Sequence, residues 1–249
     1  MRYDDFQWLR VAVEDGIALV TLSNPSTGNA VTYESHLELG RILPALSDDA
    51  SVRTVLVAAD GPDFCVGPSP EIMRRLAEDG PAFGMSVMVS VERLVRCCVD
   101  FDKPVVSAIN GRAAGGPLVF AMLADVVIAE RDVRFSDTHV RNGVVAGDGG
   151  ILVWPMALGL LRAKRYLLTG AELTATDAER YGLVTEVADV GQGREVALRY
   201  ARELASMPET AVRYTKRALN EWLRAAMPAF TLGWAGEILT ATGPATVDG

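Results

Sequence analysis

Residues 103–129 read KPVVSAINGRAAGGPLVFAMLADVVIA. Two short apolar runs, at 105–110 and 125–130, are typical of strands buried on both faces. A glycine-rich turn at 111–116 separates the first run from an apolar segment that begins at Pro117, and proline is favoured in the first turn of a helix. The stretch therefore predicts a strand, a glycine turn, a helix and a second strand, which is the repeating unit of an α/β fold.

The sequence on either side extends this alternation. An Asp15-Gly16 step between two alternating runs predicts a hairpin. Helical and strand patterns alternate as far as about residue 190, and only helical patterns follow. The other expected elements are a strand at 54–59 and helices at 33–47, 84–101, 117–123, 159–169, 174–181 and from 193 onward. The order favours an α/β core over residues 1–192 and a helical region over 193–249 that packs on the core and on neighbouring subunits.

Charge and composition narrow the class of protein. A net charge of −8 disfavours binding to nucleic acid, which depends on clustered Lys and Arg. The longest apolar runs are too short to span a membrane, and the first residues lack the apolar segment of a signal peptide. Three cysteines, Cys65, Cys97 and Cys98, allow no complete disulfide framework and have no spacing typical of a metal site. We expect a reduced, cytoplasmic protein without a metal or a membrane partner.

Residues 135–150, FSDTHVRNGVVAGDGG, hold one of the two histidines of the chain. Asp148 follows His139 nine residues later and stands between glycines. A carboxylate beside an imidazole fixes its tautomer and raises its basicity, so that it can take a proton from water. Two other interpretations stay open: His139 is a buried structural residue, or Asp148 only caps a helix that begins near Gly150.

Two glycine turns could bind an anion. In residues 55–72 and again in 105–122, a buried strand leads through glycines to a helix. Such a turn leaves backbone N–H groups unpaired at the start of the helix, where they can hold a developing oxyanion. The pattern by itself is also explained by tight turns alone.

These pieces, taken in order, resemble the crotonase (enoyl-CoA hydratase/isomerase) superfamily. The matching segments are NAVTYESHLEL (29–39), GPDFCVGPS (61–69), residues 103–129, FSD (135–137), GDGG (147–150), GLLRAKRYLLTGAELTATDAERYGLVTEV (159–187) and ARELASMPETAVRYTKRAL (201–219). The resemblance implies a spiral of ββα units and a helical C-terminal region that assembles a trimer or a dimer of trimers. It also implies two backbone N–H groups that stabilise an enolate or oxyanion, usually of an acyl-CoA thioester.

Carried onto this chain, the family's motifs give Gly116 as one N–H donor. The other donor position, after Gly67, is occupied by Pro68, which has no N–H. The two glutamates of the hydratases correspond to Val119 and His139, so addition of water by two glutamates is not available here.

Within the superfamily, the nearest resemblance is to β-diketone hydrolases of the 6-oxocamphor hydrolase type, which cleave a C–C bond between two ketones without CoA. It rests on THVRNGVVAGDGGILVWPMALG (138–159) and RYLLTGAEL (165–173). It implies that His36 and Glu237 bind substrate together with Gly67, Pro68 and Val119. The chain departs from that branch at Gly116 and Val31, where the branch carries histidine and tryptophan.

The function expected is hydrolytic cleavage of a small dicarbonyl by water that His139 and Asp148 activate, with Gly116 holding the oxyanion. A first alternative is an enzyme that acts on a coenzyme A thioester. Its phosphates would need cations, for which the candidates are Arg74, Arg75, Lys216 and Arg217. The remaining alternatives are an inactive oligomeric scaffold and an enzyme with Cys65 as its nucleophile.

Overall fold

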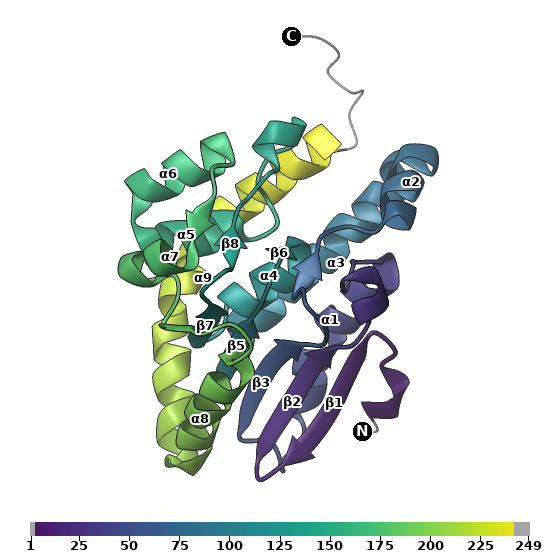
Figure 1. Ribbon diagram of the computed structural model, residues 1–249. Helices are drawn as coiled ribbons and strands as arrows, with labels where there is room; N and C mark the ends of the chain where they lie inside the picture. Colours follow the sequence, from purple (N-terminus) through teal and green to yellow (C-terminus); the bar gives the residue numbers. More distant parts are fainter. Residues whose placement is uncertain (1–2, 242–249) are drawn as a thin grey trace.

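A computed structural model, which describes residues 3–241, has a six-stranded sheet at its centre (Figure 1). The strands, in spatial order, are β1 (Leu9–Glu14), β2 (Ile17–Leu22), β3 (Thr54–Ala59), β5 (Val105–Ile109), β7 (Val126–Glu130) and β10 (Glu186–Ala188). β1 and β2 form the expected antiparallel hairpin, and both turn residues, Asp15 and Gly16, have positive φ. All the other neighbours pair in parallel. The α/β architecture is therefore confirmed.

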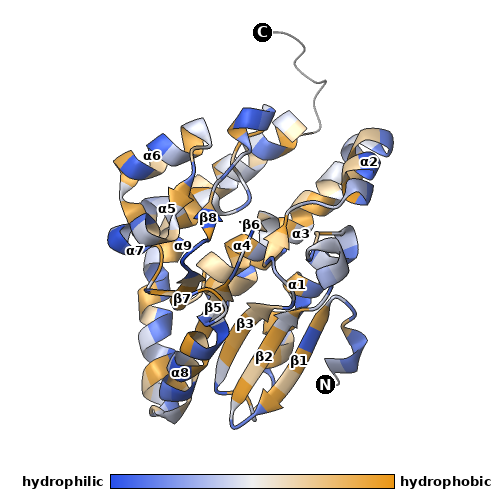
Figure 2. Cartoon of the chain, in the orientation of Figure 1, coloured by the Kyte–Doolittle hydropathy of each residue, from blue (hydrophilic) through white to orange (hydrophobic). Residues whose placement is uncertain are grey.

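Helices cover both faces of this sheet. On one face lie α1 (Tyr33–Ser47), α3 (Gly80–Asp100) and α4 (Gly115–Met122), and on the other lies α8 (Gly193–Ser206). Alternate residues of each strand supply the two cores: Val55 and Val57 face the first layer, whereas Leu56 packs toward α8. Figure 2 shows the strands as strongly hydrophobic and the outer surface of α8 as mostly hydrophilic.

The remaining elements extend the molecule beyond the strand ends. They are α2 (Pro70–Glu78), α5 (Gly150–Leu158), α6 (Leu160–Thr169), α7 (Ala175–Tyr181), the short strands β4 (Cys65–Val66), β6 (Ala113–Ala114), β8 (Arg134–Phe135) and β9 (Leu173–Thr174), and α9 (Glu209–Ala241). Three 3-10 turns lie at Tyr3–Asp5, Pro25–Thr27 and Val140–Asn142. Two of these helices agree with the sequence analysis: α2 follows the first glycine turn, and α5 begins at Gly150, where the capping interpretation of Asp148 placed a helix.

The C-terminal helices pack on the rest of the chain. α8 completes the second core of the sheet, and α9 contacts α3 and α5. Phe230 of α9 is fully buried, whereas Trp222 is 70% exposed. The proposed boundary at residue 192 and the assembly of subunits stay predictions. Among the described residues, no helix combines the length and the apolar character needed to cross a membrane.

Candidate active site

The two glycine turns lie side by side. β4 pairs in parallel with β6, which places Cys65 opposite Ala113 and Val66 opposite Ala114. The chain then turns at Gly67 (φ +96°) and Gly115 (φ +70°), conformations that side-chain-bearing residues rarely adopt. A Cβ on Gly115 would lie 3.7 Å from Cα of Gly67. The turns predicted to form an oxyanion hole are therefore neighbours.

Only one of the two turns offers the expected backbone donor. Pro68 sits in a bridge to Val31, and its flanking residues are tied there: Val31 N–H donates to Gly67 O (2.8 Å) and Ser69 N–H donates to Val31 O (2.8 Å). The loop keeps this register, so Pro68 occupies the donor position without an N–H group. Gly116, in the first turn of α4, retains its N–H.

His36, on α1, lies directly against Gly116. A Cβ on Gly116 would approach Cε1 of His36 to 2.8 Å and Nδ1 to 3.3 Å. Any larger residue at position 116 would therefore displace the imidazole. Burial lowers the pKa of His36 to about 4, so this imidazole is neutral at neutral pH. Among residues 3–241, its Nδ1 has no hydrogen-bond partner.

His139 follows β8 and is held by Asp137, a residue that the sequence reasoning overlooked. Oδ1 of Asp137 accepts hydrogen bonds from the His139 backbone N–H (3.1 Å) and from its Nδ1–H (2.7 Å). Strand β8 itself runs beside β6 through the Arg112–Arg134 bridge, which brings this loop next to the glycine turns. The local signal was present in the Asp-Thr-His spacing, since a carboxylate two residues before a histidine can bond both its backbone and its ring.

Two further carboxylates face the other nitrogen of the ring. Nε2 of His139 lies 3.9 Å from Oδ2 of Asp148 and 3.6 Å from Oε1 of Glu237, which reaches it from α9. We expected Asp148 to fix the tautomer of His139; the structure corrects this, because Asp137 makes that bond and Asp148 lies on the Nε2 side. Both separations exceed the length of a direct hydrogen bond.

The glycines around Asp148 allow this packing. A Cβ on Gly147 would lie 2.4 Å from the Gly233 carbonyl oxygen and 2.7 Å from Oε2 of Glu237. A Cβ on Gly150 would lie 2.8 Å from Oδ2 of Asp137. The glycine-rich run thus lets α9 and the aspartate loop approach the imidazole. Asp148 also accepts a marginal bond from Gly150 N–H (3.5 Å), so the capping interpretation accounts for little of its placement.

In the cluster of Asp137, His139, Asp148 and Glu237, three groups have shifted pKa values: His139, Asp148 and Glu237. Burial opposes a charge on His139, but Asp148, Asp137 and Glu237 outweigh it and raise its pKa to about 10. Burial, reinforced by the charge of Asp148, raises the pKa of Glu237 to about 8. Burial also raises the pKa of Asp148, which the nearby imidazolium opposes. At neutral pH, His139 is therefore an imidazolium and Glu237 is mostly protonated, and Asp148 binds a proton more readily than an ordinary aspartate does.

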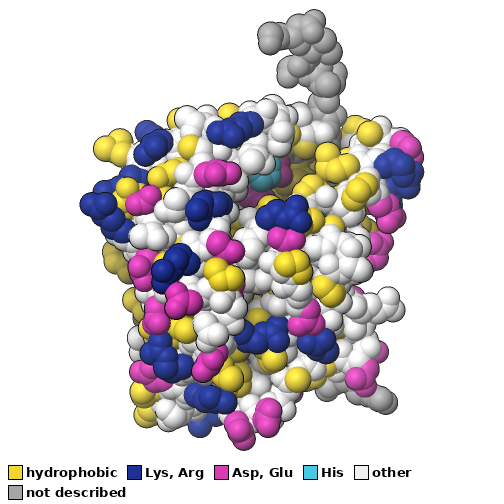
Figure 3. All heavy atoms as spheres, viewed as in Figure 1, with side chains coloured by type: hydrophobic (Ala, Val, Ile, Leu, Met, Phe, Trp, Pro, Cys, Tyr) yellow, Lys and Arg dark blue, Asp and Glu magenta, His cyan; other side chains and the backbone are white. Residues whose placement is uncertain are grey.

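Val119 lies one turn after Gly116 on α4. It is buried in an apolar cluster with Val95, Leu152 and Phe230, and a Cβ on Gly149 would lie 2.6 Å from its Cγ1. This gives Val119 a packing role behind the Asp148 loop. Its contact with substrate stays a prediction. Figure 3 shows a histidine at the edge of a hollow lined by hydrophobic side chains, with acidic side chains beside it.

The cluster also has the composition of a possible metal site. Ligand atoms of Asp137, His139 and Asp148 all lie within 4.8 Å of one another. The Nδ1 of His139 is already bonded to Asp137, so an ion would have to bind Nε2, and it would displace the proton that the carboxylates hold there. The expectation of a metal-free site stays a prediction.

The cysteines and the candidate phosphate ligands lie in other settings. Burial raises the pKa of Cys65 to about 11, which does not suit a nucleophile. Lys216 is buried and bonded to Asp125 (2.7 Å) and to the Lys103 carbonyl, which corrects the idea that it could reach a CoA phosphate. Arg74 pairs with Glu78, and Arg75 pairs with Asp79 while stacking on Phe83; Arg217 lies over Tyr214.

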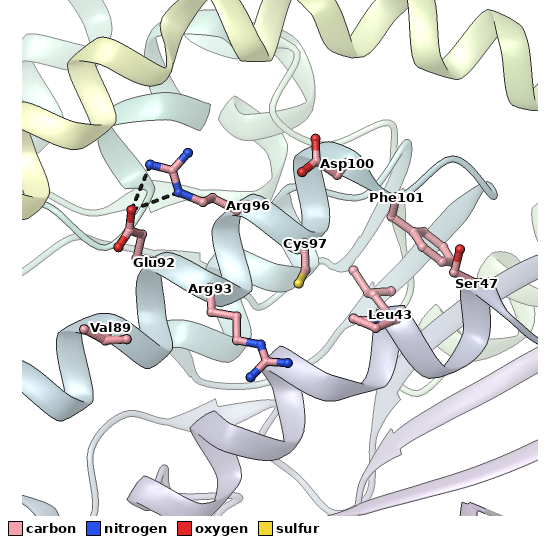
Figure 4. Close-up of a pocket in the computed structure, with 10 residues that line it drawn as sticks. Leu43, Ser47, Val89, Glu92, Arg93, Arg96, Cys97, Asp100 and Phe101 are labelled. Carbon is pink, nitrogen blue, oxygen red and sulfur yellow. Dashed lines mark hydrogen bonds and ion pairs between the residues drawn. The ribbon is translucent and has the colours of Figure 1, made fainter. Parts of the chain in front are cut away.

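A groove of about 400 Å³ lies between α1 and α3, apart from the cluster around His139 (Figure 4). Arg93 and Cys97 face it, and Glu92 and Arg96 pair at its edge. Burial raises the pKa of the Cys97 thiol. This groove contains none of the predicted site residues.

Comparison with known proteins identifies relatives across most of the chain. The enoyl-CoA hydratase/isomerase family profile matches residues 12–232. A 1,2-epoxyphenylacetyl-CoA isomerase of Escherichia coli is 33% identical over 210 residues, which are 84% of this chain and 80% of the relative. An (E)-benzylidenesuccinyl-CoA hydratase of Thauera aromatica is 32% identical over 211 residues, covering 83% and 79% of the two chains.

Solved structures share the fold. An enoyl-CoA hydratase/isomerase from Mycobacterium paratuberculosis superposes with a TM-score of 0.89 at 30% identity, covering 95% of this chain and 94% of the other. A β-diketone hydrolase from the cyanobacterium Anabaena, bound to (S)-3-oxocyclohexyl acetic acid, superposes with a TM-score of 0.85 at 27% identity over 96% of both chains.

Proposed function

Because the chain belongs to the enoyl-CoA hydratase/isomerase family, whose members are enzymes that include both hydratases and isomerases, we propose that it hydrolyses the C–C bond between the two carbonyl groups of a small β-diketone. The observation that supports this most is the buried cluster at Nε2 of His139, where Oδ2 of Asp148 lies 3.9 Å and Oε1 of Glu237 lies 3.6 Å from the ring nitrogen. Hydrolysis needs a base that takes a proton from water and an acid that returns one to the product.

The cluster can supply both groups. A carboxylate whose pKa is raised by burial is a stronger general base than an exposed one, and burial raises the pKa of Asp148. The imidazolium of His139, oriented by Asp137, is a suitable proton donor. The proposed roles thus differ from the expected ones, in which the imidazole took the proton from water.

The reaction balances with these residues. The water oxygen attacks one carbonyl carbon, its proton passes to Asp148, and the carbonyl oxygen becomes an oxyanion beside Gly116 N–H. The C–C bond then breaks, leaving a carboxylic acid and an enolate. His139 protonates the enolate carbon to give the ketone. The proton on Asp148 then returns through the next water to His139, whose Nε2 lies 3.9 Å from Oδ2 of Asp148.

The surroundings of the site favour a small substrate without CoA. The cluster carries three carboxylates around one imidazole, and the four cations proposed for phosphates are paired, stacked or buried. The likeness to the Anabaena β-diketone hydrolase supports the same class of reaction.

The test compares His139→Ala, Asp148→Asn and the double variant on cyclic and bicyclic β-diketones. Because the two residues serve one proton-transfer cycle, we expect each change to lower kcat/KM by at least about a thousandfold, and the double variant to be little worse than either. Asp189→Asn, which alters an exposed carboxylate paired with Arg131, serves as the matched control. Additive losses, or an Asp148→Asn variant as active as the control, would contradict the shared role.

The second candidate is an enzyme that acts on acyl-CoA, as the names of the E. coli and Thauera relatives indicate for those proteins. Turnover of an enoyl-CoA by the wild-type chain, without turnover of any β-diketone, would favour it. A chain that forms oligomers but acts on neither class would favour the scaffold alternative. We further propose a homotrimer or dimer of trimers, since α9 and α6 expose large apolar side chains, including Trp222, Leu232 and Leu161.

A further inference from the structure

The helix that carries Glu237 is interrupted by a proline. Pro228 lies inside α9, where it has no N–H to donate to the carbonyl four residues earlier and its ring crowds that carbonyl. The first half of α9 is anchored on the sheet by buried Lys216, whose Nζ lies 2.7 Å from Oδ2 of Asp125. Because this anchor precedes the proline, the direction of the second half depends on contacts of its own.

The position of the Glu237 carboxylate depends on the helix more than on bonds of its own. Its Oε1 lies 3.6 Å from Nε2 of His139, beyond the length of a direct hydrogen bond. Among residues 3–241, its Oε2 has no hydrogen-bond partner, although the residue is only 7% exposed. The distance from this carboxylate to the imidazole is therefore set by where the second half of α9 lies.

Two side chains anchor the second half of α9, one on each side of Glu237. Three residues earlier, Nε1–H of Trp234 donates to the carbonyl oxygen of Met88 on α3 (2.9 Å). Three residues later, Oγ1 of Thr240 accepts a hydrogen bond from the backbone N–H of Val145 (3.0 Å). Because residues three apart are neighbours on one side of a helix, the two anchors and the carboxylate lie on the same side of α9.

The Thr240 contact ties α9 to the loop that carries the imidazole and Asp148. Val144, next to Val145, donates its N–H to the carbonyl oxygen of His139 (2.9 Å). Asp148 follows three residues after Val145. The hydroxyl at position 240 therefore fixes the second half of α9 relative to the two residues that the proposed reaction uses.

We infer that Trp234 and Thr240 are positioning residues that hold the carboxylate of Glu237 beside Nε2 of His139. This deepens the proposed function and rests on it. Glu237 acts on the imidazole through its charge: burial lowers the pKa of His139, whereas three surrounding carboxylates, Glu237 among them, raise it. A misplacement of about 1 Å at a reacting site can lower the rate about a hundredfold, so the anchors matter for the proton transfers.

The experiment removes each anchor by a change that alters little else in the full chain. Thr240→Val removes the hydroxyl and keeps the shape, whereas Thr240→Ser keeps the hydroxyl. Trp234→Phe keeps an aromatic ring without the N–H. The matched control is Thr231→Val, since the Thr231 hydroxyl donates to the Met227 carbonyl oxygen of its own helix (3.1 Å). Circular dichroism and thermal unfolding identify the variants that fold.

The first readout is the pKa of His139, followed by proton NMR of the imidazole C2–H signal. Glu237→Gln removes the charge and gives the full effect of that carboxylate on the pKa. We expect Thr240→Val and Trp234→Phe each to lower the pKa of His139 by at least about a third of that full effect, and the double variant by most of it. Thr240→Ser and the Thr231→Val control should leave the pKa unchanged.

The second readout is kcat on a β-diketone. We expect Thr240→Val and Trp234→Phe each to lower kcat about tenfold with a smaller change in KM, because the anchors act on proton transfer and not on substrate binding. In a Glu237→Gln background, Thr240→Val should add less than about a threefold loss, since the charge that it positions is gone. A loss of the same size in both backgrounds would show a structural role and overturn the inference.

The NMR readout needs no substrate and therefore separates this inference from the proposed function. A wild type that turns over no β-diketone refutes the proposed function, and the pKa of His139 in the variants still decides whether Trp234 and Thr240 hold Glu237. If the folded double variant keeps the wild-type pKa of His139, the inference is wrong, whatever the wild type hydrolyses.

Discussion

Removing the charge of Asp148 should shift the titration of His139 by an amount that the geometry sets. Two unit charges about 4 Å apart interact by about 4 kcal/mol at the effective dielectric of 20 that suits protein sites. The Nε2–Oδ2 distance is 3.9 Å. Since 1.36 kcal/mol corresponds to one pKa unit, Asp148→Asn should lower the pKa of His139 by up to about three units, from about 10 toward about 7.

The chain is well suited to this measurement, because it contains only two histidines. Proton NMR of the imidazole C2–H signals should show one group titrating near pH 10 and the other near pH 4, with His36→Asn assigning the second. Asp137→Asn should also lower the pKa of His139, since it removes both a hydrogen bond and a charge. The exposed Asp189→Asn variant controls for the change in net charge.

Two results would refute the reasoning. If His139 titrates near 6.5 in the wild type, burial and the carboxylates cancel, and the imidazolium cannot serve as the resting acid. If Asp148→Asn shifts the titration no more than Asp189→Asn does, then Asp148 is already protonated or lies farther from the ring than 3.9 Å, and its role as base is wrong.

Further predictions concern activity, assembly and stability. Crotonyl-CoA hydration should fall several orders of magnitude below ordinary enzyme efficiency, because Val119 carries no proton and Pro68 no N–H; a kcat/KM above about 10⁴ M⁻¹s⁻¹ would contradict this. Light scattering should give a mass of three or six 26.7-kDa chains, and a monomer at micromolar concentration would contradict the proposed assembly. The folded pKa of His36, about 4, lies below the unfolded value near 6.5, so the unfolded chain binds the extra proton and stability falls as the pH drops through this window, by up to about 3 kcal/mol. Urea unfolding at pH 7 and pH 4.5 should show a smaller loss of unfolding free energy in His36→Asn than in the wild type. Equal losses would indicate that the imidazole of His36 is exposed to solvent.

Much of the fold could be predicted from the sequence, because its signals are local. The hairpin depends on Asp15-Gly16, whose backbone conformation suits a tight turn. The strands at β3, β5 and β7 follow from short apolar runs, and α7 begins at Thr174, whose side chain caps it as the Thr174–Asp177 spacing indicates. The absence of a donor at Pro68 is covalent, so no structure is needed to know it.

The arrangement of the site was decided by tertiary structure. The sequence indicated that His139 and Asp148 belong to the site. Which carboxylate faces which ring nitrogen depends on side-chain rotamers and on the conformation of the loop. In the structure, Asp137 bonds Nδ1 and Asp148 lies on the Nε2 side. Glu237 reaches the imidazole only because α9 folds back across α5, with Gly147 leaving room for it.

His36 shows the same division most clearly. It lies 80 residues before Gly116 in the chain. The helical pattern around it indicates only that it belongs to α1. Its contact with Gly116 arises because α1 and α4 pack on the same face of the sheet. Local patterns determine which segments become helices and strands, since those depend on neighbouring residues. A constellation drawn from α1, α4, the β8 loop and α9 depends on long-range packing, and only the folded chain brings it together.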